Sequence, residues 1–249
     1  MRLSDYQELP GTVRRESAPA GVPLILNYSG KLTVDGAATF DAGFVAGPDD
    51  RFADTHSDGD GRGVQVGLTW LEARQILGLP LSEVVYRGVT VDELWGRDGR
   101  RLIDRLGGTA TPMDRMALVA HFLQRRRRPD AAPPVVAGAA TLLSRYHGRI
   151  SISQLAEQLG FGRQHVHREV AHHLGLPPRT LARLLRFQAA TAAIRRGTGL
   201  ATVAADCGYY DQAHLAREFR ALAGDTPSGY ATSVQAGPPP AGLASAAGN

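Results

Sequence analysis

The sequence contains one cysteine, one lysine and no long run of apolar residues. Because Cys207 is alone, a disulfide framework and a thiolate metal cluster are excluded, and we expect this residue to be a small buried hydrophobe. No apolar run approaches the roughly 20 residues of a membrane span, and residues 1–16 lack the apolar core of a signal peptide. We therefore expect a cytoplasmic protein with no membrane partner.

Signatures of catalysis are also missing. No Ser–His–Asp pattern, phosphate-cradling glycine loop or catalytic carboxylate pair is present. The segment Asp54–Gly61 invites a metal hypothesis, because His56, Asp58 and Asp60 alternate in it. A calcium loop would need a Glu near its twelfth position and flanking helices, and a cupin-type metal would need several clustered histidines. We interpret this segment as a polar surface loop and predict no metal, no cofactor and no enzymatic activity.

Charge is unevenly divided along the chain, although its sum is only +4. Residues 1–124 hold 13 basic and 17 acidic side chains, whereas residues 131–249 hold 11 basic and 6 acidic ones, and Arg125 to Arg128 add four positive charges between them. A basic second half indicates a polyanionic partner. Arginine suits phosphate and guanine edges, but an arginine-rich composition also follows from a GC-rich genome. The run at 125–128 either contacts DNA or stays solvated.

Residues 152–230 contain one two-helix pattern twice. In the leading helices, an offset of 48 aligns Ala156, Gly160 and Phe161 with Ala204, Gly208 and Tyr209. In the trailing helices, an offset of 49 aligns His165 with His214, Arg168 with Arg217, Glu169 with Glu218 and Gly175 with Gly224. Helices that cross steeply need a small residue at their contact and glycine where the backbone turns. The pattern therefore predicts two helix–turn–helix units.

The segment between the units, Thr180–Arg196, predicts one rigid helix. Its seventeen residues at roughly 1.5 Å each span about 25 Å. With the units at its ends, this approaches the roughly 34 Å between successive major-groove faces of DNA. One chain is then able to place two recognition helices in successive major grooves, which helix–turn–helix dimers do with two chains.

The first recognition helix, predicted at Arg163–Leu174, has Val166 and Val170 on its inner face. Helical spacing then places Gln164, His167 and Arg168 outward, with Arg163 at the helix start. Arg168 suits guanine, Gln164 suits adenine and His167 suits a base edge. For each, the alternative is a phosphate contact or exposure to solvent. We expect His172 and His173 to be solvated.

The second recognition helix, predicted at Asp211–Ala223 with Asp211 as its cap, offers fewer hydrogen-bonding groups. Its candidate DNA-contacting residues are Gln212, Ala213, His214, Ala216, Arg217 and Arg220. Alanines meet thymine methyl groups but form no side-chain hydrogen bonds. We therefore hypothesise that the first unit discriminates between sequences while the second mainly anchors on phosphate.

These units resemble the DNA-binding domain of AraC/XylS transcriptional regulators over about Ala137 to Tyr230. The passage VAADCGYYDQAHLAREFRALAGDTPSGY, residues 203–230, has the family's Gly-aromatic, Asp-Gln, Arg before Phe and Gly-x-Thr-Pro elements. Three positions depart from it: Gly162 and Pro177, where hydroxyl residues are usual, and Leu215, where an aromatic is common. A missing cap oxygen at Pro177 costs about 1 kcal/mol.

The resemblance has implications for the function. It implies base contacts at Gln164, His167 and Arg168, double-stranded DNA and RNA polymerase as partners, and promoter activation as the usual outcome. It also implies a cupin-like barrel in the N-terminal half that senses a small molecule or sets homodimerisation. Alkylation-repair regulators of similar C-terminal type need reactive or zinc-binding cysteines in the other half, and this chain has none there.

The N-terminal half itself predicts short strands, at residues 22–28, 31–35, 38–45 and 63–69, with turns at Ser29-Gly30 and Asp35-Gly36. The passage RGVQVGLTWLEARQILGLPLSEV also looks like part of the family's barrel. Thr111-Pro112 then opens a helix whose apolar stripe comprises Met116, Val119, Ala120 and Leu123. This stripe either packs under the barrel or forms a dimerisation helix.

We expect an α+β protein of four segments. These are a β-rich sensing or dimerisation domain at 1–124, a linker at 125–133, a double helix–turn–helix domain at 134–232 and a disordered tail at 233–249. The function expected is that of a transcriptional regulator, activating in the simplest case, controlled by an unknown effector. The alternative is a ligand-independent repressor or architectural protein whose N-terminal domain only dimerises.

Overall fold

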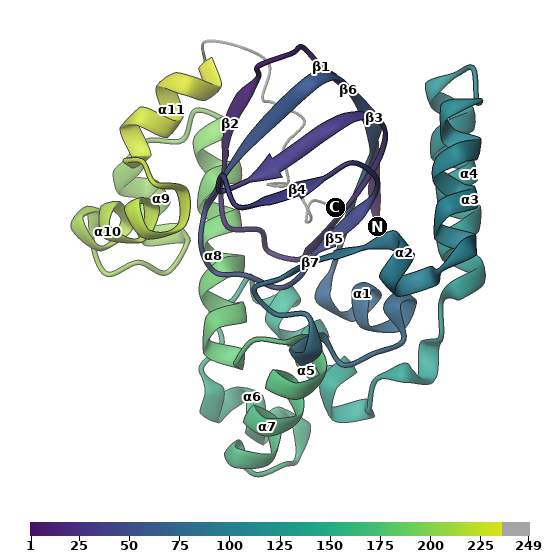
Figure 1. The fold of residues 1–249 in the computed structure, drawn as a ribbon. Coiled ribbons are helices and arrows are strands. Elements are labelled where there is room, and N and C mark those ends of the chain that lie inside the picture. The colour runs from purple at the N-terminus through teal and green to yellow at the C-terminus, as the bar shows by residue number, and fades with distance from the viewer. Residues whose placement is uncertain (236–249) are drawn as a thin grey trace.

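A computed structural model describes residues 1–235 and shows a β-rich half joined to a helical half (Figure 1). Most of the tail predicted to be disordered, residues 236–249, lies outside the described residues. Its first residues, 233–235, belong to helix α11 (Pro227–Gln235), so the prediction is wrong there. The α+β architecture predicted from the sequence is confirmed.

The N-terminal half is built on one antiparallel sheet of seven strands. The strands are β1 (Arg2–Glu8), β2 (Val13–Glu16), β3 (Val22–Val34), β4 (Ala38–Phe40), β5 (Phe44–Ala46), β6 (Ala53–Leu68) and β7 (Gly88–Thr90). Their order is β1-β6-β3-β5-β7, with β2 paired to β6 and β4 paired to β3. The long strands β3 and β6 form the centre, because each pairs with several short ones.

Two local predictions in this sheet are wrong and one is confirmed. Ser29-Gly30 is no turn but an irregularity inside β3, where the pairing with β6 shifts register. Asp54–Gly61 is no loop but part of β6, since Thr55 and Ser57 face inward and its backbone pairs with β2 and β3. Asp35-Gly36 does form the predicted turn, with φ of 50° and 64°.

Alternation along the two central strands divides apolar side chains between the two faces of the sheet. Leu24 and Leu26 of β3 join the main core, as do Val64 and Val66 of β6. Ile25, between the two leucines, points to the other face and packs in a separate small cluster with two phenylalanines. The sheet therefore has a core face and a second face that is only partly filled.

Four helices complete the N-terminal half: α1 (Trp70–Leu77), α2 (Val91–Trp95), α3 (Arg97–Gly107) and α4 (Pro112–Arg126). Thr111 caps α4 as predicted. Val119 and Leu123 of α4 are fully buried, which favours core packing for its apolar stripe. The arginine run, which begins in the last turn of α4, lies at the surface but is tied to the N-terminal half, because Arg126 pairs with Asp98 and Nε of Arg127 donates to Gln75.

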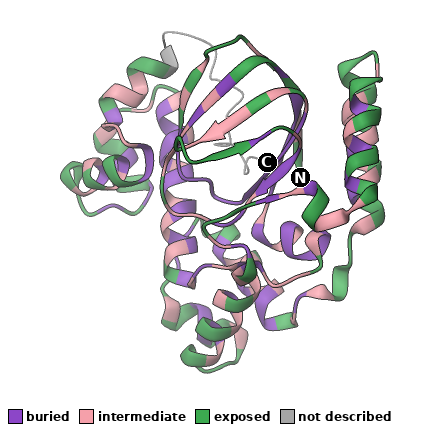
Figure 2. Ribbon diagram, in the orientation of Figure 1, coloured by how far each residue is buried: buried purple, intermediate pink, exposed green. Residues whose placement is uncertain are grey.

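The C-terminal half contains α5 (Pro134–Arg145), α6 (Ile152–Leu159), α7 (Arg163–Leu174), α8 (Pro178–Arg195), α9 (Leu200–Asp206), α10 (Gln212–Ala223) and α11. Ser151 and Gln154 form the predicted capping box of α6. Helix α8 begins at Pro178, and its N-cap residue, Pro177, makes no side-chain capping hydrogen bond. Its buried positions run along most of its length (Figure 2), because it packs between the two helix–turn–helix units. Among residues 1–235, no helix is long and apolar enough to cross a bilayer.

The N-terminal half contacts both units at equivalent points. Gly175 and Gly224, matched in the repeat, end α7 and α10 in the left-handed conformation, with φ of 83° and 65°. A Cβ atom on Gly175 would lie 2.8 Å from Cγ of Pro48, and one on Gly224 would lie 3.1 Å from the ring of Phe52. The N-terminal half therefore approaches both recognition helices at their C-terminal ends.

Polar contacts reinforce this junction. The backbone N–H of Ala18 donates to the carbonyl of Leu222, 2.7 Å away. Arg183 of α8 pairs with Glu218 of α10 at 2.7 Å and with Asp50 of the N-terminal half at 3.4 Å. One arginine thus connects the N-terminal half, the helix between the units and the second recognition helix.

The prediction that His172 and His173 are solvated is confirmed for His172, which is exposed, and wrong for His173, whose side chain is 14% exposed. Nε of Arg74 donates to Nδ1 of His173 at 3.2 Å, and Oγ of Ser82 lies 3.4 Å from Nδ1 of His172. Periodicity along α7 could not show this, because both partners lie about 90 to 100 residues earlier in the chain. The end of α7 is therefore part of the junction between the two halves.

This contact makes stability depend on pH. Burial lowers the pKa of His173, and the charges of Arg74 and His172 lower it further, against the opposing effect of Glu169. A protonated ring cannot accept the Arg74 N–H. Because the folded pKa lies below the ordinary 6.5, the unfolded chain takes up the proton first, and stability is lost as the pH falls below about 6.5.

We expect the fall in Tm between about pH 7.5 and about pH 5.5 to be larger for the wild type than for His173→Asn. Asparagine offers an amide oxygen to Arg74 but does not titrate, so it is the matched control for other titrating groups. Thermal unfolding at both pH values measures the difference. Equal falls in the two proteins would show that His173 contributes nothing to the pH dependence.

Candidate nucleic-acid interface

The two helix–turn–helix units share one turn geometry. In the first, the N–H of Phe161 donates to the carbonyl of Ala156 at 3.1 Å, and in the second the N–H of Tyr209 donates to that of Ala204 at 2.9 Å. These residues are matched in the sequence repeat. The glycine before each aromatic residue has a positive φ, 71° at Gly160, which explains why the repeat retains glycine there. The duplication is therefore one of backbone structure as well as of sequence.

The first recognition helix, α7, buries one face and exposes the other. Val166, Val170 and Leu174 are fully buried. The four predicted DNA-contacting residues, Arg163, Gln164, His167 and Arg168, are all exposed. They lie in the first half of α7, away from the end that meets the N-terminal half.

Arg168 is exposed but not isolated. Its Nη2 lies 3.0 Å from Nδ1 of His165, its Nε donates to Glu169 at 3.1 Å, and the side chain is 70% exposed. An ion pair this open to water contributes little to stability. The guanidinium can therefore exchange Glu169 for a guanine edge or a phosphate at small cost.

The second recognition helix, α10, is arranged in the same way. Asp211 caps it as predicted, accepting the N–H of His214 at 2.6 Å. Of the predicted residues, Gln212, Ala213, Arg217 and Arg220 are exposed, while His214 and Ala216 are half-buried. The ring of His214 accepts the backbone N–H of Tyr210 and packs edge-on against Tyr209, so it supports the turn.

Two exposed aromatic residues at the turns are not among the predicted DNA-contacting residues. Tyr210 directly precedes the Asp211 cap of α10 and is 93% exposed, and Phe161 in the first turn is 46% exposed. Neither belongs to a helical stripe, which is the signal that periodicity detects. Their position in the sequence, directly before each recognition helix, is the signal that could have identified them as candidate contact residues. Cys207, by contrast, is buried as expected, and burial raises the pKa of its thiol.

In Figure 1, α7 lies by the lower end of α8, whereas α10 lies to the side of α8, apart from α7. Helix α8 packs against α7, α9 and α10, and α10 meets it through the Arg183–Glu218 ion pair and the Phe187–Phe219 ring contact. The exposed faces of α7 and α10 are green in Figure 2, whereas α8 between them is largely buried. The structure therefore carries two separate polar helix faces on one rigid support.

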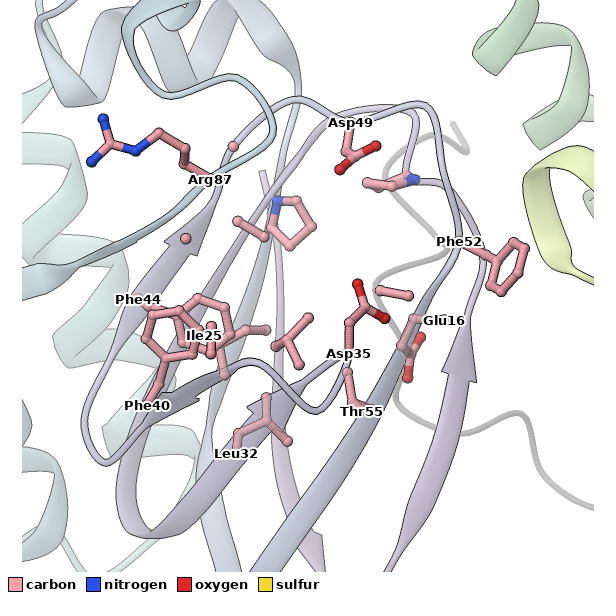
Figure 3. Close-up of a pocket in the computed structure, with 18 of the residues that line it drawn as sticks. Glu16, Ile25, Leu32, Asp35, Phe40, Phe44, Asp49, Phe52, Thr55 and Arg87 are labelled. Atoms are coloured by element: carbon pink, nitrogen blue, oxygen red, sulfur yellow. The ribbon is translucent and has the colours of Figure 1, made fainter.

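A second candidate site is a cavity of about 320 Å³ on the partly filled face of the N-terminal sheet. Its apolar end contains Ile25, Phe40 and Phe44, with the two phenyl rings stacked 3.9 Å apart. The lining also includes charged residues, which are Glu8, Glu16, Asp35, Asp49, Arg51 and Arg87. In Figure 3, Glu16 and Asp35 lie near the middle of the site, whereas Arg87 points away from it. The sequence reasoning named none of these residues as a site.

Comparison with known proteins agrees with this geometry. Residues 155–233 match a family model described as a helix-turn-helix domain. ToxT from Vibrio cholerae O395 has a similar fold over 93% of this chain and 96% of its own, with a TM-score of 0.53 and 11% identity. A second ToxT structure from Vibrio cholerae gives a TM-score of 0.56 at 11% identity over 93% and 97% of the chains. No curated protein sequence matches the chain.

A third ToxT structure, the unsaturated fatty acid bound wild-type protein of Vibrio cholerae strain SCE256, gives a TM-score of 0.53 at 9% identity over 92% and 94% of the chains. Identities this low establish the fold, and the matched model establishes the helix–turn–helix domain. The chain thus carries a helix–turn–helix domain of the AraC type behind a sheet-rich N-terminal domain, in the two-domain fold of ToxT.

Proposed function

We propose that the protein is a sequence-specific transcription regulator that reads two successive major grooves with α7 and α10. The observation that carries this proposal is the pair of equivalent, exposed recognition helices that both pack on α8. Its 18 residues span about 27 Å at roughly 1.5 Å each. To enter successive major grooves, the exposed faces of α7 and α10 need a separation of roughly 34 Å, which is one turn of DNA.

The exposed side chains suit different parts of DNA. We assign Arg168 to guanine, Gln164 to adenine and His167 to a base edge, because these groups match major-groove donors and acceptors. On α10, Arg217 and Arg220 suit phosphate, and the alanines suit thymine methyl groups. Arg163, Gln212 and His214 complete the proposed contact surface. The first unit then supplies most of the discrimination between base sequences, and the second anchors the protein on the phosphate backbone.

We further propose that a small molecule in the N-terminal cavity controls DNA binding. The cavity wall and the junction with the helix–turn–helix units share one stretch of chain. Asp49 and Phe52 line the cavity, while Pro48 lies against Gly175 and Phe52 lies against Gly224. An occupant that moves this stretch changes how the N-terminal domain holds both recognition helices. The fatty acid bound by ToxT supports an effector in this fold.

For the outcome, we propose promoter activation through RNA polymerase in the cytoplasm, as the resemblance to AraC-type regulators suggests. Homodimerisation through α4 remains a prediction. A promoter–reporter fusion decides the sign of regulation, because an activator raises expression and a repressor lowers it.

Selection of bound duplexes from a randomised library by the full-length chain tests the proposal. We expect a motif in two parts whose centres lie about 10 base pairs apart, with more sequence information in one part than in the other. The absence of any enriched motif, or one short motif of a single half-site, would overturn it.

A further inference from the structure

We propose that Tyr210 binds the sugar–phosphate backbone of DNA at the edge of the groove that α10 enters. The ring packs on a deoxyribose, and the hydroxyl donates a hydrogen bond to a phosphate oxygen. The inference rests on the proposed function, in which α10 enters a major groove. It adds a contact residue that the predicted set does not contain.

Tyr210 is the residue by which the second turn is longer than the first. In the first unit, only Phe161 stands between the turn glycine and the N-cap of α7. In the second unit, Tyr209 and Tyr210 both stand between the turn glycine and the Asp211 cap of α10. This extra residue accounts for the change of offset from 48 to 49 between the leading and trailing helices.

Of the two tyrosines, Tyr209 is the structural counterpart of Phe161. The ring of Phe161 lies 5.1 Å from that of His165, and the ring of Tyr209 lies 5.3 Å from that of His214, the matched histidine. Tyr209 is also buried. It therefore takes the structural role of Phe161, and Tyr210 has no counterpart in the first unit.

The side chain of Tyr210 is available for a partner, while its backbone is fixed. The residue is 93% exposed, and its side chain makes no hydrogen bond or ring contact with any of residues 1–235. Its backbone N–H donates to Nδ1 of His214 at 3.3 Å, and Asp211 directly after it caps α10. A tyrosine on such a support offers a large amphipathic surface with only two side-chain torsions to order.

The position of Tyr210 suits the backbone of DNA better than its bases. The N-terminal residues of a recognition helix reach base edges, so the turn before them lies at the edge of the groove, where the sugars and phosphates run. Tyrosine is among the side chains that donate to phosphate. Because the phenol is neutral, this contact neutralises no phosphate charge and adds nothing to the salt dependence of binding.

Tyr210→Phe removes only the hydroxyl and tests the contact. Titration of a fluorescent duplex with the full-length chain should show binding about tenfold weaker than wild type. The loss should be the same for the selected duplex and for duplexes with altered half-sites, because a backbone contact carries no sequence information. The slope of log affinity against log salt concentration should stay the same. Tyr210→Ala should bind more weakly still, since it also removes the ring.

Tyr209→Phe is the matched control, because it makes the same change one residue earlier in the chain. The Tyr209 hydroxyl is buried and has no hydrogen-bond partner among the described residues, so its removal should leave the affinity for DNA unchanged.

Three outcomes would overturn the inference: wild-type affinity in both Tyr210 variants, a loss confined to one base sequence, or an equal loss in Tyr209→Phe. The wild-type chain separates this failure from failure of the proposed function. If the wild type selects a two-part motif, any of these outcomes rejects only the Tyr210 contact. If it selects no motif, the proposed function is rejected and this contact with it.

Discussion

An Arg168→Ala variant should bind its selected duplex roughly 5- to 150-fold more weakly and should accept other bases at one position. A guanidinium that grips guanine by two hydrogen bonds contributes about 1–3 kcal/mol of discrimination, and each 1.4 kcal/mol is a factor of ten in affinity. The exposed pair with Glu169 offsets little of this. Competition between the variant and the wild type for a randomised-site library measures both effects.

Arg217→Ala is the matched control, because Arg217 occupies the equivalent position in α10 and is also exposed. A phosphate contact carries no sequence information, so its loss should weaken binding to all duplexes alike. It should also reduce the slope of log affinity against log salt concentration by about one. Equal relaxation of base preference by the two variants would contradict the proposed division between the units.

A Phe219→Ala variant should lose about 3–5 kcal/mol of unfolding free energy. Phe219 is fully buried in the second unit, and its ring centroid lies 4.8 Å from that of Phe187 and 5.7 Å from that of Tyr230. Truncation leaves a cavity between α8, α10 and α11 and removes both ring contacts. Denaturant unfolding of the full-length chain measures the loss.

Tyr210→Ala is the control for this experiment, because Tyr210 is an aromatic residue of the same unit with 93% of its surface exposed. Its removal should change the unfolding free energy by less than about 0.5 kcal/mol. Comparable losses from both substitutions would mean that Phe219 does not hold the second unit together.

The helical half could be predicted from local chemistry, because its signals repeat at fixed spacing. The capping box of Ser151 and Gln154 predicts the start of α6, and Asp211 predicts the start of α10. Gly175 and Gly224 predict where α7 and α10 end. Each of these roles depends only on neighbours within one or two turns. The exposed faces of α7 and α10 follow from the same periodicity.

The sheet and the junction could not be predicted in the same way. Asp54–Gly61 is polar enough to resemble a loop, but its backbone pairs with strands that precede it by some 20 to 40 residues. His173 meets Arg74 only after the two halves pack. The cavity likewise collects side chains from β1, β2, β3, β4, β5 and β6, so no single stretch of sequence carries its pattern.

The affinity of the full-length chain for duplexes with altered half-site spacing tests the central claim most directly. If α8 fixes the separation of two groove readers, moving the half-sites apart by about five base pairs, half a helical turn, should reduce affinity at least about 100-fold. Adding a full turn of about ten base pairs should not restore it, because one rigid helix cannot lengthen. Unchanged affinity across these spacings would contradict the account.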